Sequence, residues 1–100
     1  MIISNIPSNL VCIKGTGVTV ALSGLTRINT IIPRTAEYAI IRAIGGSFTT
    51  TTDGRTPEAG TVGRSYGNAD DYLISREDAE YAKFIADDAT ALDVEFFVSK

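Results

Sequence analysis

The sequence contains no histidine, no tryptophan and only one cysteine, at position 12. Histidine is the commonest general base and the commonest metal ligand in proteins, so its absence excludes the usual serine triad and the histidine-ligated zinc sites. A single cysteine forms neither an internal disulfide nor a thiolate zinc cluster. We therefore expect a protein that is not an enzyme and that uses no cofactor or metal.

Long apolar runs and strongly basic stretches are also missing. No run approaches the roughly 20 apolar residues that a membrane-spanning helix needs, and the first residues, MIISNIP, lack the basic flank of a signal peptide. The net charge of −3 provides no positive field for the phosphate backbone of nucleic acids. We expect a chain that is made in a cytoplasm and binds neither membranes nor nucleic acids.

Hydrophobic residues make up 44% of the chain, and they recur mainly at every second position. This period places alternate side chains on one face of a strand. It predicts an all-β fold, either a small antiparallel β-sandwich or a jelly-roll or Ig-like barrel, formed by residues 9–100 as one domain. Residues 1–8 contain Pro7 and show no period, so we expect them to form an extended N-terminal arm. The expected strands are 9–14, 18–22, 36–44, 47–52, 61–66, 71–75, 81–86 and 92–99.

Two of these strands carry specific expectations. In residues 36–44 both the odd and the even positions are largely apolar, which predicts a central strand covered on both faces. Arg42 in this strand would then need a charged partner or access to water. In residues 92–99 apolar and acidic residues alternate, and Phe97 interrupts the acidic face. Such an aromatic residue either contacts a neighbouring molecule or packs under a loop.

Residues 75–89 are the one segment in which a helix competes with a strand. Ser75 and Asp78 have the spacing of a capping box, whereas the acidic pair Asp87 and Asp88 would oppose the dipole at the end of a longer helix. We therefore expect a helical turn at about 76–80, followed by the strand 81–86. Residues 53–68 are rich in glycine and predict a long ordered loop, with or without a short strand at 61–66.

Few residues are candidates for chemistry. Neither acidic pair, at 70–71 and at 87–88, forms a shared carboxylate site on a strand, because adjacent side chains point to opposite faces. Cys12 lies between Val11 and Ile13 and is expected to be a small buried apolar residue, with a nucleophile as the alternative. The four tyrosines suit either the core and rim of a sandwich or a sugar-binding surface; they are Tyr38, Tyr66, Tyr72 and Tyr81.

Charge is distributed unevenly along the chain. Residues 1–52 hold four basic residues and one acidic residue, whereas residues 66–100 hold three basic and nine acidic residues. Such asymmetry allows identical subunits to meet through faces of opposite charge, although solvated loops produce the same pattern. Solvated loops are the favoured explanation of the charge pattern by itself, and a homo-oligomer is nevertheless expected for this chain.

Several segments, taken together, resemble a known class of proteins. They are YAIIRAIGG at 38–46, TDGRTP at 52–57, Gly63, AKFIA at 82–86 and LDVEFF at 92–97. As a set they resemble small virion structural proteins of tailed bacteriophages and prophages, over roughly residues 36–98. The resemblance implies a β-sandwich that functions as a capsid decoration (cement) protein or as a neck or tail accessory subunit in the virion.

The segment TTDGRTP at 51–57 is also similar to a turn of the Ig-like accessory domains found beside chitin- and hexosamine-degrading enzymes. A tight Asp-Gly turn followed by proline is useful in any sandwich. This second resemblance implies an Ig-like carbohydrate-binding or adhesion module that uses Tyr66, Tyr72 and the 53–68 loop.

The phage resemblance leads to the main functional expectation. We expect a virion protein that binds and stabilises the lattice of the major capsid protein by surface contacts. The expected partners are the major capsid protein or other virion subunits. The expected contact residues are Ile2, Ile3 and Ile6 in the arm, Arg55 and Arg64 in the long loop, and Phe97 in the last strand.

Overall fold

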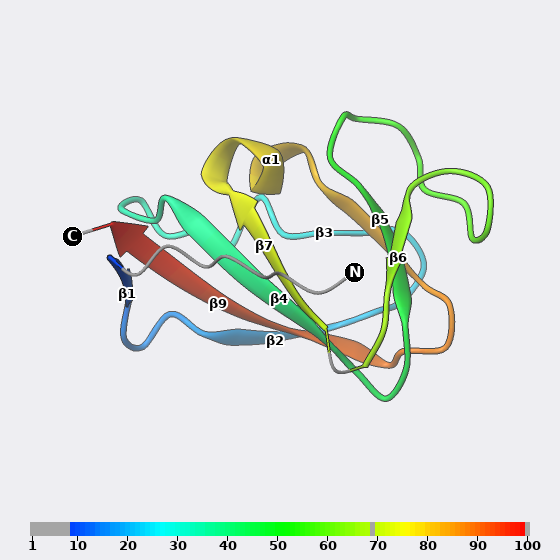
Figure 1. The fold of residues 1–100 in the computed structure, drawn as a ribbon, viewed down its shortest axis with the longest axis horizontal. Coiled ribbons are helices and arrows are strands. Elements are labelled where there is room, and N and C mark those ends of the chain that lie inside the picture. Colours follow the sequence, from blue (N-terminus) through cyan, green and yellow to red (C-terminus); the bar gives the residue numbers. More distant parts are fainter. Residues whose placement is uncertain (1–8, 69, 100) are drawn as a thin grey trace.

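Alternating apolar residues build a five-stranded antiparallel sheet. The computed structural model describes residues 9–68 and 70–99. The longest strand, β9 (Ala91–Ser99), pairs on one side with β4 (Tyr38–Ile44), which in turn pairs with β7 (Asp71–Ser75). On its other side β9 pairs with β1 (Leu10–Cys12) near its end and with β2 (Val18–Ala21) near its start. Figure 1 shows these strands as one twisted layer.

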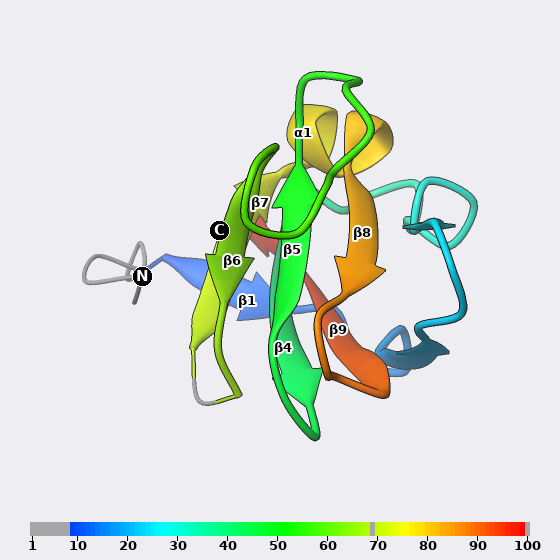
Figure 2. The same cartoon turned by 90° about the vertical axis from the view of Figure 1, so that its right-hand side faces the viewer.

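The remaining strands form a second antiparallel sheet of four strands. Its order is β3 (Thr26–Arg27), β8 (Lys83–Ala86), β5 (Phe48–Thr51) and β6 (Arg64–Tyr66). Figure 2 shows β8, β5 and β6 side by side, with the loop after β5 folded in front of them. The two sheets pack against each other, so the expected small all-β sandwich is confirmed. The short strand β3 was not expected.

Three pairs of strands pass from one sheet to the other at the same corner. The chain runs from β4 into β5, from β6 into β7 and from β8 into β9. In the first sheet β4 pairs with β7 and β9, and in the second sheet its continuation β5 pairs with their continuations β6 and β8. Two of the crossings are tied together by Ser47, whose carbonyl oxygen accepts the backbone N–H of Asp87, Asp88 and Ala89. Two sheets joined by bent strands at one corner diverge from that corner, as in orthogonal sheet packing.

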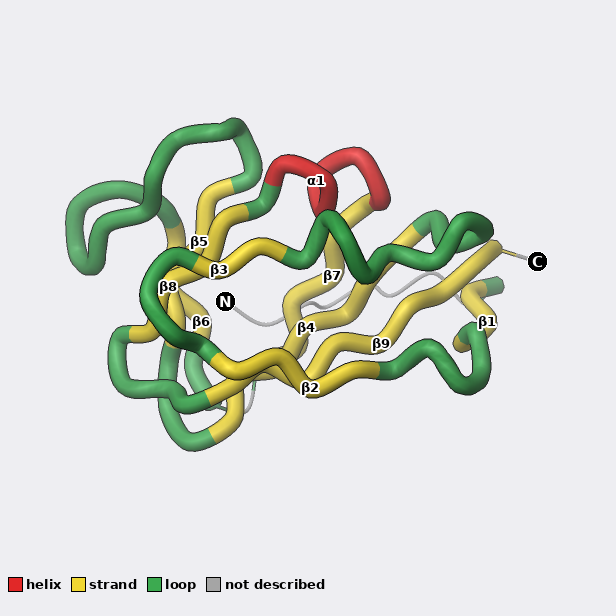
Figure 3. Tube along the Cα trace, turned by 180° about the vertical axis from the view of Figure 1, so that it is seen from behind, coloured by secondary structure: helices red, strands yellow, loops and turns green. Residues whose placement is uncertain are grey.

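The core lies between the sheets. Its largest fully buried side chains include Phe48, Phe84 and Phe96, which come from β5, β8 and β9. Ile28 is also fully buried, because the segment after β3 crosses the inner face of the five-stranded sheet, as Figure 3 shows from behind. Each fully buried side chain of this size contributes roughly 1.5–3 kcal/mol of transfer free energy.

Strand β4 lies in the interior of its sheet, as expected, but the prediction that both its faces are covered was wrong. Ala39, Ile41 and Ala43 are buried, whereas Arg42 and Ile44, on the opposite face, are exposed. Arg42 lies 2.7 Å from Asp71 on the neighbouring strand and also reaches water. The error arises because apolar residues occur at both odd and even positions of this strand. Such a pattern does not indicate which face the second sheet covers.

The strand covered on both faces is the threonine-rich β5. All four of its residues are buried, and each buried hydroxyl has a hydrogen-bond partner, which makes the burial of polar groups tolerable. Thr49 donates to Asp87 at 2.8 Å, and Thr50 donates to the Lys83 carbonyl at 2.9 Å. Tertiary contacts, and not hydrophobicity, therefore determine which strand becomes the most enclosed.

The helix expected near residue 76 is confirmed as α1 (Arg76–Tyr81), with the following strand beginning at Lys83. Ser75 caps it by accepting the backbone N–H of Asp78 at 3.2 Å. The helix ends because Ala82 returns to an extended conformation. Ala79 is buried, so this short helix closes the end of the sandwich that lies opposite the corner.

Candidate functional site

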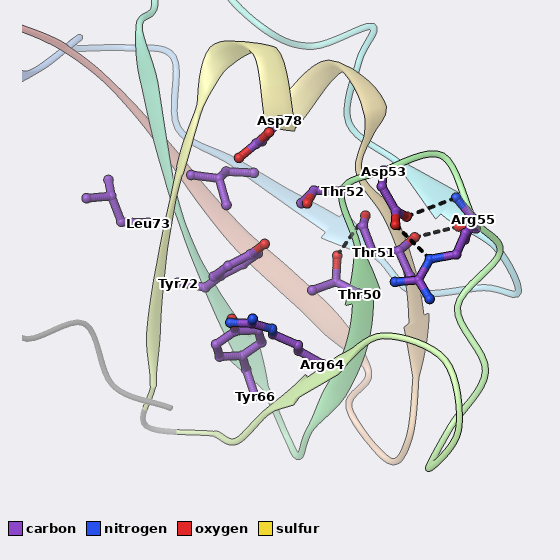
Figure 4. A pocket seen from close by; sticks show the side chains of 11 residues that line it. Thr50, Thr51, Thr52, Asp53, Arg55, Arg64, Tyr66, Tyr72, Leu73 and Asp78 are labelled. Atoms are coloured by element: carbon purple, nitrogen blue, oxygen red, sulfur yellow. Dashed lines mark hydrogen bonds and ion pairs between the residues drawn. The ribbon is translucent and has the colours of Figure 1, made fainter.

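A polar pocket opens at the side of the sandwich, where the edge strands β6 and β7 diverge. Its volume is about 390 Å³. The lining comes from both sheets, the long loop and the helix, namely residues 50–53, Arg55, Arg64, Tyr66, residues 72–74 and Asp78. Figure 4 shows Tyr72, Thr50 and Arg64 facing the space between the two sheets, whereas Leu73 points away from it.

Two tyrosines form the apolar part of the pocket. The rings of Tyr66 and Tyr72 are stacked with centroids 4.3 Å apart, and the ring of Phe48 lies 5.6 Å from Tyr66. Tyr66 is almost fully buried, and Tyr72 is half-buried. Burial raises the pKa of Tyr72, and the neighbouring Tyr66 and Asp78 raise it further. The Tyr72 phenol therefore stays protonated and can donate a hydrogen bond.

The long loop contributes a neutralised ion pair to the rim. Arg55 Nε lies 2.7 Å from Asp53 Oδ2, and the Arg55 backbone N–H donates to Asp53 Oδ1 at 3.2 Å. That backbone hydrogen bond is the main reason why the pKa of Asp53 is lowered. Thr51 donates its hydroxyl proton to the Arg55 carbonyl and so fixes the loop to β5. Both charged side chains are more than half exposed, so they remain accessible to a ligand.

Two further charges in the pocket lack protein partners. Within residues 9–68 and 70–99, the Arg64 guanidinium and the Asp78 carboxylate make no hydrogen bond or ion pair. In Figure 4 they lie on either side of the Tyr72 side chain. The pocket therefore offers a free donor group and a free acceptor group that flank a phenol.

A second candidate surface is the outer face of the five-stranded sheet. Tyr38 lies opposite Phe97, which lies opposite Cys12, and Ile40 lies opposite Leu73. These five side chains are half-buried and are here called the outer patch. Among the described residues, no helix or strand of the other sheet lies over this face (Figure 1). The outer patch is therefore a group of apolar side chains from neighbouring strands in register, and it borders the exposed carboxylate of Glu95, which lies opposite Ile40 on the same face.

Cys12 lies on a strand, as expected, but it is only partly buried, so the expectation of a fully buried apolar residue was too strong. Its strand lies at the edge of the sheet, and the side chain is on the outer face opposite Phe97. The pKa of the thiol is raised by burial and by the nearby Glu95 carboxylate. A thiol held in its protonated form is a poor nucleophile, which disfavours the alternative of covalent chemistry.

The contact residues expected from the sequence fall into three groups. Arg55 and Arg64 both line the pocket, together with Tyr66 and Tyr72 from the carbohydrate alternative. Phe97 belongs to the outer patch and does not line the pocket. Ile2, Ile3 and Ile6 lie outside the described residues.

The sequence did not indicate Thr50, Thr52 or Asp78 as pocket residues. Thr50 and Thr52 belong to a β-branched run that signals only an extended strand, and Asp78 was assigned solely to a capping box. They meet because the chain bends between β6 and β7, so that α1, which follows β7, brings Asp78 to a pocket that residues 50–52 also line. No local signal in the sequence reports that proximity.

No group of three or more cysteine, aspartate and glutamate side chains in residues 9–68 and 70–99 is arranged to hold a metal ion. No helix in this part of the chain has the length and apolar character needed to cross a bilayer.

Comparison of the chain with known protein families, with curated proteins and with solved structures gave no match.

Proposed function

We propose that this chain is a non-enzymatic structural protein of a bacteriophage virion that decorates the capsid and stabilises the lattice of the major capsid protein. The resemblance of residues 36–98 to small virion proteins supports this function. The observation that carries it is the outer patch, an apolar sheet face that a neighbouring shell subunit would cover. Such a protein acts by binding and not by catalysis. Each copy needs only a modest affinity when many copies bind one lattice.

The outer patch has the properties of a contact surface. Tyr38 and Phe97 are cross-strand partners on β4 and β9, so the backbone hydrogen bonds hold the two residues side by side on one face. Covering a large apolar side chain contributes roughly 1.5–3 kcal/mol. The neighbouring ion pair between Arg42 and Asp71 lies on the same face and supplies a polar rim.

The arm expected at residues 1–8 would add to this contact. It leads directly into β1, which lies at the edge of the same sheet. Eight extended residues span at most about 29 Å, which is enough to reach across an adjoining subunit. Its apolar side chains Ile2, Ile3 and Ile6 would then be buried against that subunit.

The test is to purify the virions whose genome encodes this chain and to count its copies by mass spectrometry. A ratio near one copy per shell subunit would support capsid decoration. About a dozen copies would indicate a neck or tail position, and complete absence from the particle would contradict a virion function.

A variant experiment tests the surface itself. Particles assembled without this chain are mixed with purified wild type, with a deletion of residues 1–8, with Phe97→Ser or with Tyr81→Ser. Tyr81 is a matched control because its ring is 57% exposed at the end of α1, away from the outer patch. We expect at least tenfold weaker binding for the deletion and for Phe97→Ser, and unchanged binding for Tyr81→Ser.

A further inference from the structure

We propose that the pocket between β6 and β7 binds a neutral, hydroxyl-rich ligand, namely a sugar residue. This inference concerns a surface other than the outer patch, so it goes beyond the proposed function. The volume of about 390 Å³ lies in the range of small-molecule sites, which combine apolar walls with a few convergent polar groups.

The charges of the pocket favour a neutral ligand. Asp53 and Arg55 neutralise each other at 2.7 Å, and the remaining charges are one cation, Arg64, and one anion, Asp78. The lining therefore has no net charge. An anionic ligand would be repelled by Asp78 and a cationic ligand by Arg64, whereas a neutral ligand is compatible with both groups.

The two unpartnered charges also match the hydrogen-bonding character of a sugar. A guanidinium only donates hydrogen bonds, and an ionised carboxylate only accepts them. Each hydroxyl of a sugar both donates and accepts, so one molecule can accept from Arg64 and donate to Asp78. Both groups act electrostatically on the Tyr72 phenol that lies between them.

The hydroxyl groups of β5 extend this pattern. Thr50 and Thr51 donate their protons to the carbonyl oxygens of Lys83 and Arg55. Their oxygen atoms keep lone pairs that can accept, and the protonated phenol of Tyr72 can donate. The pocket wall therefore combines hydrogen-bond donors with acceptors, as a ligand rich in hydroxyl groups requires.

The stacked tyrosines supply the apolar surface. Tyr72 is supported by Tyr66, which is supported in turn by Phe48, so the ring is held in place before a ligand arrives. The C–H groups of a sugar pack against such rings while its hydroxyls reach polar neighbours. A preorganised wall lowers the entropic cost of binding.

The experiment is an NMR titration of the isotope-labelled full-length chain with glucose, galactose, mannose, N-acetylglucosamine and maltose. Gluconate and glucosamine serve as anionic and cationic counterparts of the same carbon framework. We expect at least one neutral sugar to cause saturable shifts of the Arg64 side chain and of the Thr50–Thr52 amides. We expect weaker effects from the two charged compounds.

Matched variants test the assigned residues. We expect Arg64→Gln and Asp78→Asn each to weaken binding of the responding sugar at least tenfold. Arg34→Gln and Glu77→Gln, exposed residues that do not line the pocket, should leave it unchanged. Thermal unfolding of each variant verifies that the fold is intact.

A glycan array probed with the same full-length chain distinguishes the source of the sugar. Binding on the array without a response to free sugars identifies a terminal or internal residue of a larger glycan, and a response to free sugars identifies a soluble ligand. Either result supports the proposal.

The absence of binding in both experiments, a preference for gluconate or glucosamine, or equal losses in the control variants would overturn the proposal. Deletion of residues 1–8 and Phe97→Ser should not affect sugar binding, so this result is independent of the virion test.

Discussion

Gly63 shows how one residue permits the long loop to return to the sheet just before β6. Its φ of +105° lies in the region that favours glycine. A Cβ at this position would lie 2.5 Å from the backbone oxygen of Thr50, which is closer than such atoms can approach. Because Thr50 is buried in β5, the strand cannot move aside. The pocket therefore depends on a glycine that does not line it.

The first prediction concerns this residue. Gly63→Ala should lower the free energy of unfolding by about 2–4 kcal/mol, because backbone strain and steric overlap act together. Gly60→Ala is the control, since Gly60 also has a positive φ but has no atom within 4 Å of the added Cβ. It should cost only about 1–2 kcal/mol. Urea unfolding measures both, and equal losses would contradict the steric explanation.

The second prediction concerns Asp88 at the corner between the sheets. Its carboxylate accepts the backbone N–H of Ser47 at 2.6 Å and the Ser47 hydroxyl at 3.1 Å, and these bonds lower the pKa of Asp88. A carboxyl whose pKa is lower in the folded than in the unfolded chain stabilises the fold when ionised. That stability is fully present above the unfolded pKa and is lost as the pH falls through the folded pKa.

Asp88→Asn should therefore be less stable than wild type at pH 7, and the difference should shrink as the pH falls through the carboxylate range. Urea unfolding at several pH values between 7 and 3 measures this convergence. A difference that stays constant over the whole series would show that the ionised carboxylate does not contribute.

At the level of secondary-structure elements, α1 organises the loop before β4 as well as the pocket. Arg76, its first residue, donates through Nη1 to the carbonyl oxygens of Pro33, Arg34 and Ala36, at 2.7, 3.0 and 2.9 Å. One cation thus satisfies three backbone acceptors in the loop before β4. The same helix carries Asp78 into the pocket.

The third prediction follows from this contact. Arg76→Met should lower the free energy of unfolding by about 1–3 kcal/mol, because the carbonyl oxygens lose a charged donor while the apolar stem is retained. Arg34→Met, an exposed arginine whose side chain makes no hydrogen bond or ion pair within the described residues, should cost less than about 0.5 kcal/mol. Urea unfolding compares the two, and similar losses would exclude a specific role for Arg76.

At the level of the whole molecule, an aromatic cluster joins the two sheets. Phe48 on β5 contacts Phe84, Tyr66 and Tyr72, with ring centroids 5.8, 5.6 and 6.4 Å away. Three of these rings belong to the four-stranded sheet, and Tyr72 belongs to the five-stranded sheet. The cluster therefore connects the two sheets, and two of its rings, Tyr66 and Tyr72, also line the pocket.

The fourth prediction tests this bridge. Phe48→Ala should destabilise the protein by about 3–5 kcal/mol, because it removes a fully buried ring and leaves a cavity between the sheets. Phe48→Leu fills most of that space and should cost substantially less. If the alanine variant does not fold, the leucine variant still reports the effect through its thermal unfolding. A loss below about 1 kcal/mol for Phe48→Ala would show that the ring does not join the sheets.

Particular residues show how far the sequence predicts the fold. The alternation in residues 92–99 correctly identified β9, and the capping pattern from Ser75 to Asp78 correctly identified α1, because both depend on neighbours in the chain. Strand β3, with only two residues, has no periodicity to detect. The exposed face of β4 and the enclosure of β5 were not predicted, because both depend on where the second sheet packs.

The sequence by itself determined the all-β class, the helical turn and the turn positions, since periodicity, capping and glycine preferences act over a few residues. It also named Arg55, Arg64, Tyr66 and Tyr72, although it could not group them. Only the tertiary structure decided that these residues share a pocket with Thr50 and Asp78, and that Phe97 lies on a different surface. The physical reason is the common corner, which folds distant segments together through contacts that no local pattern encodes.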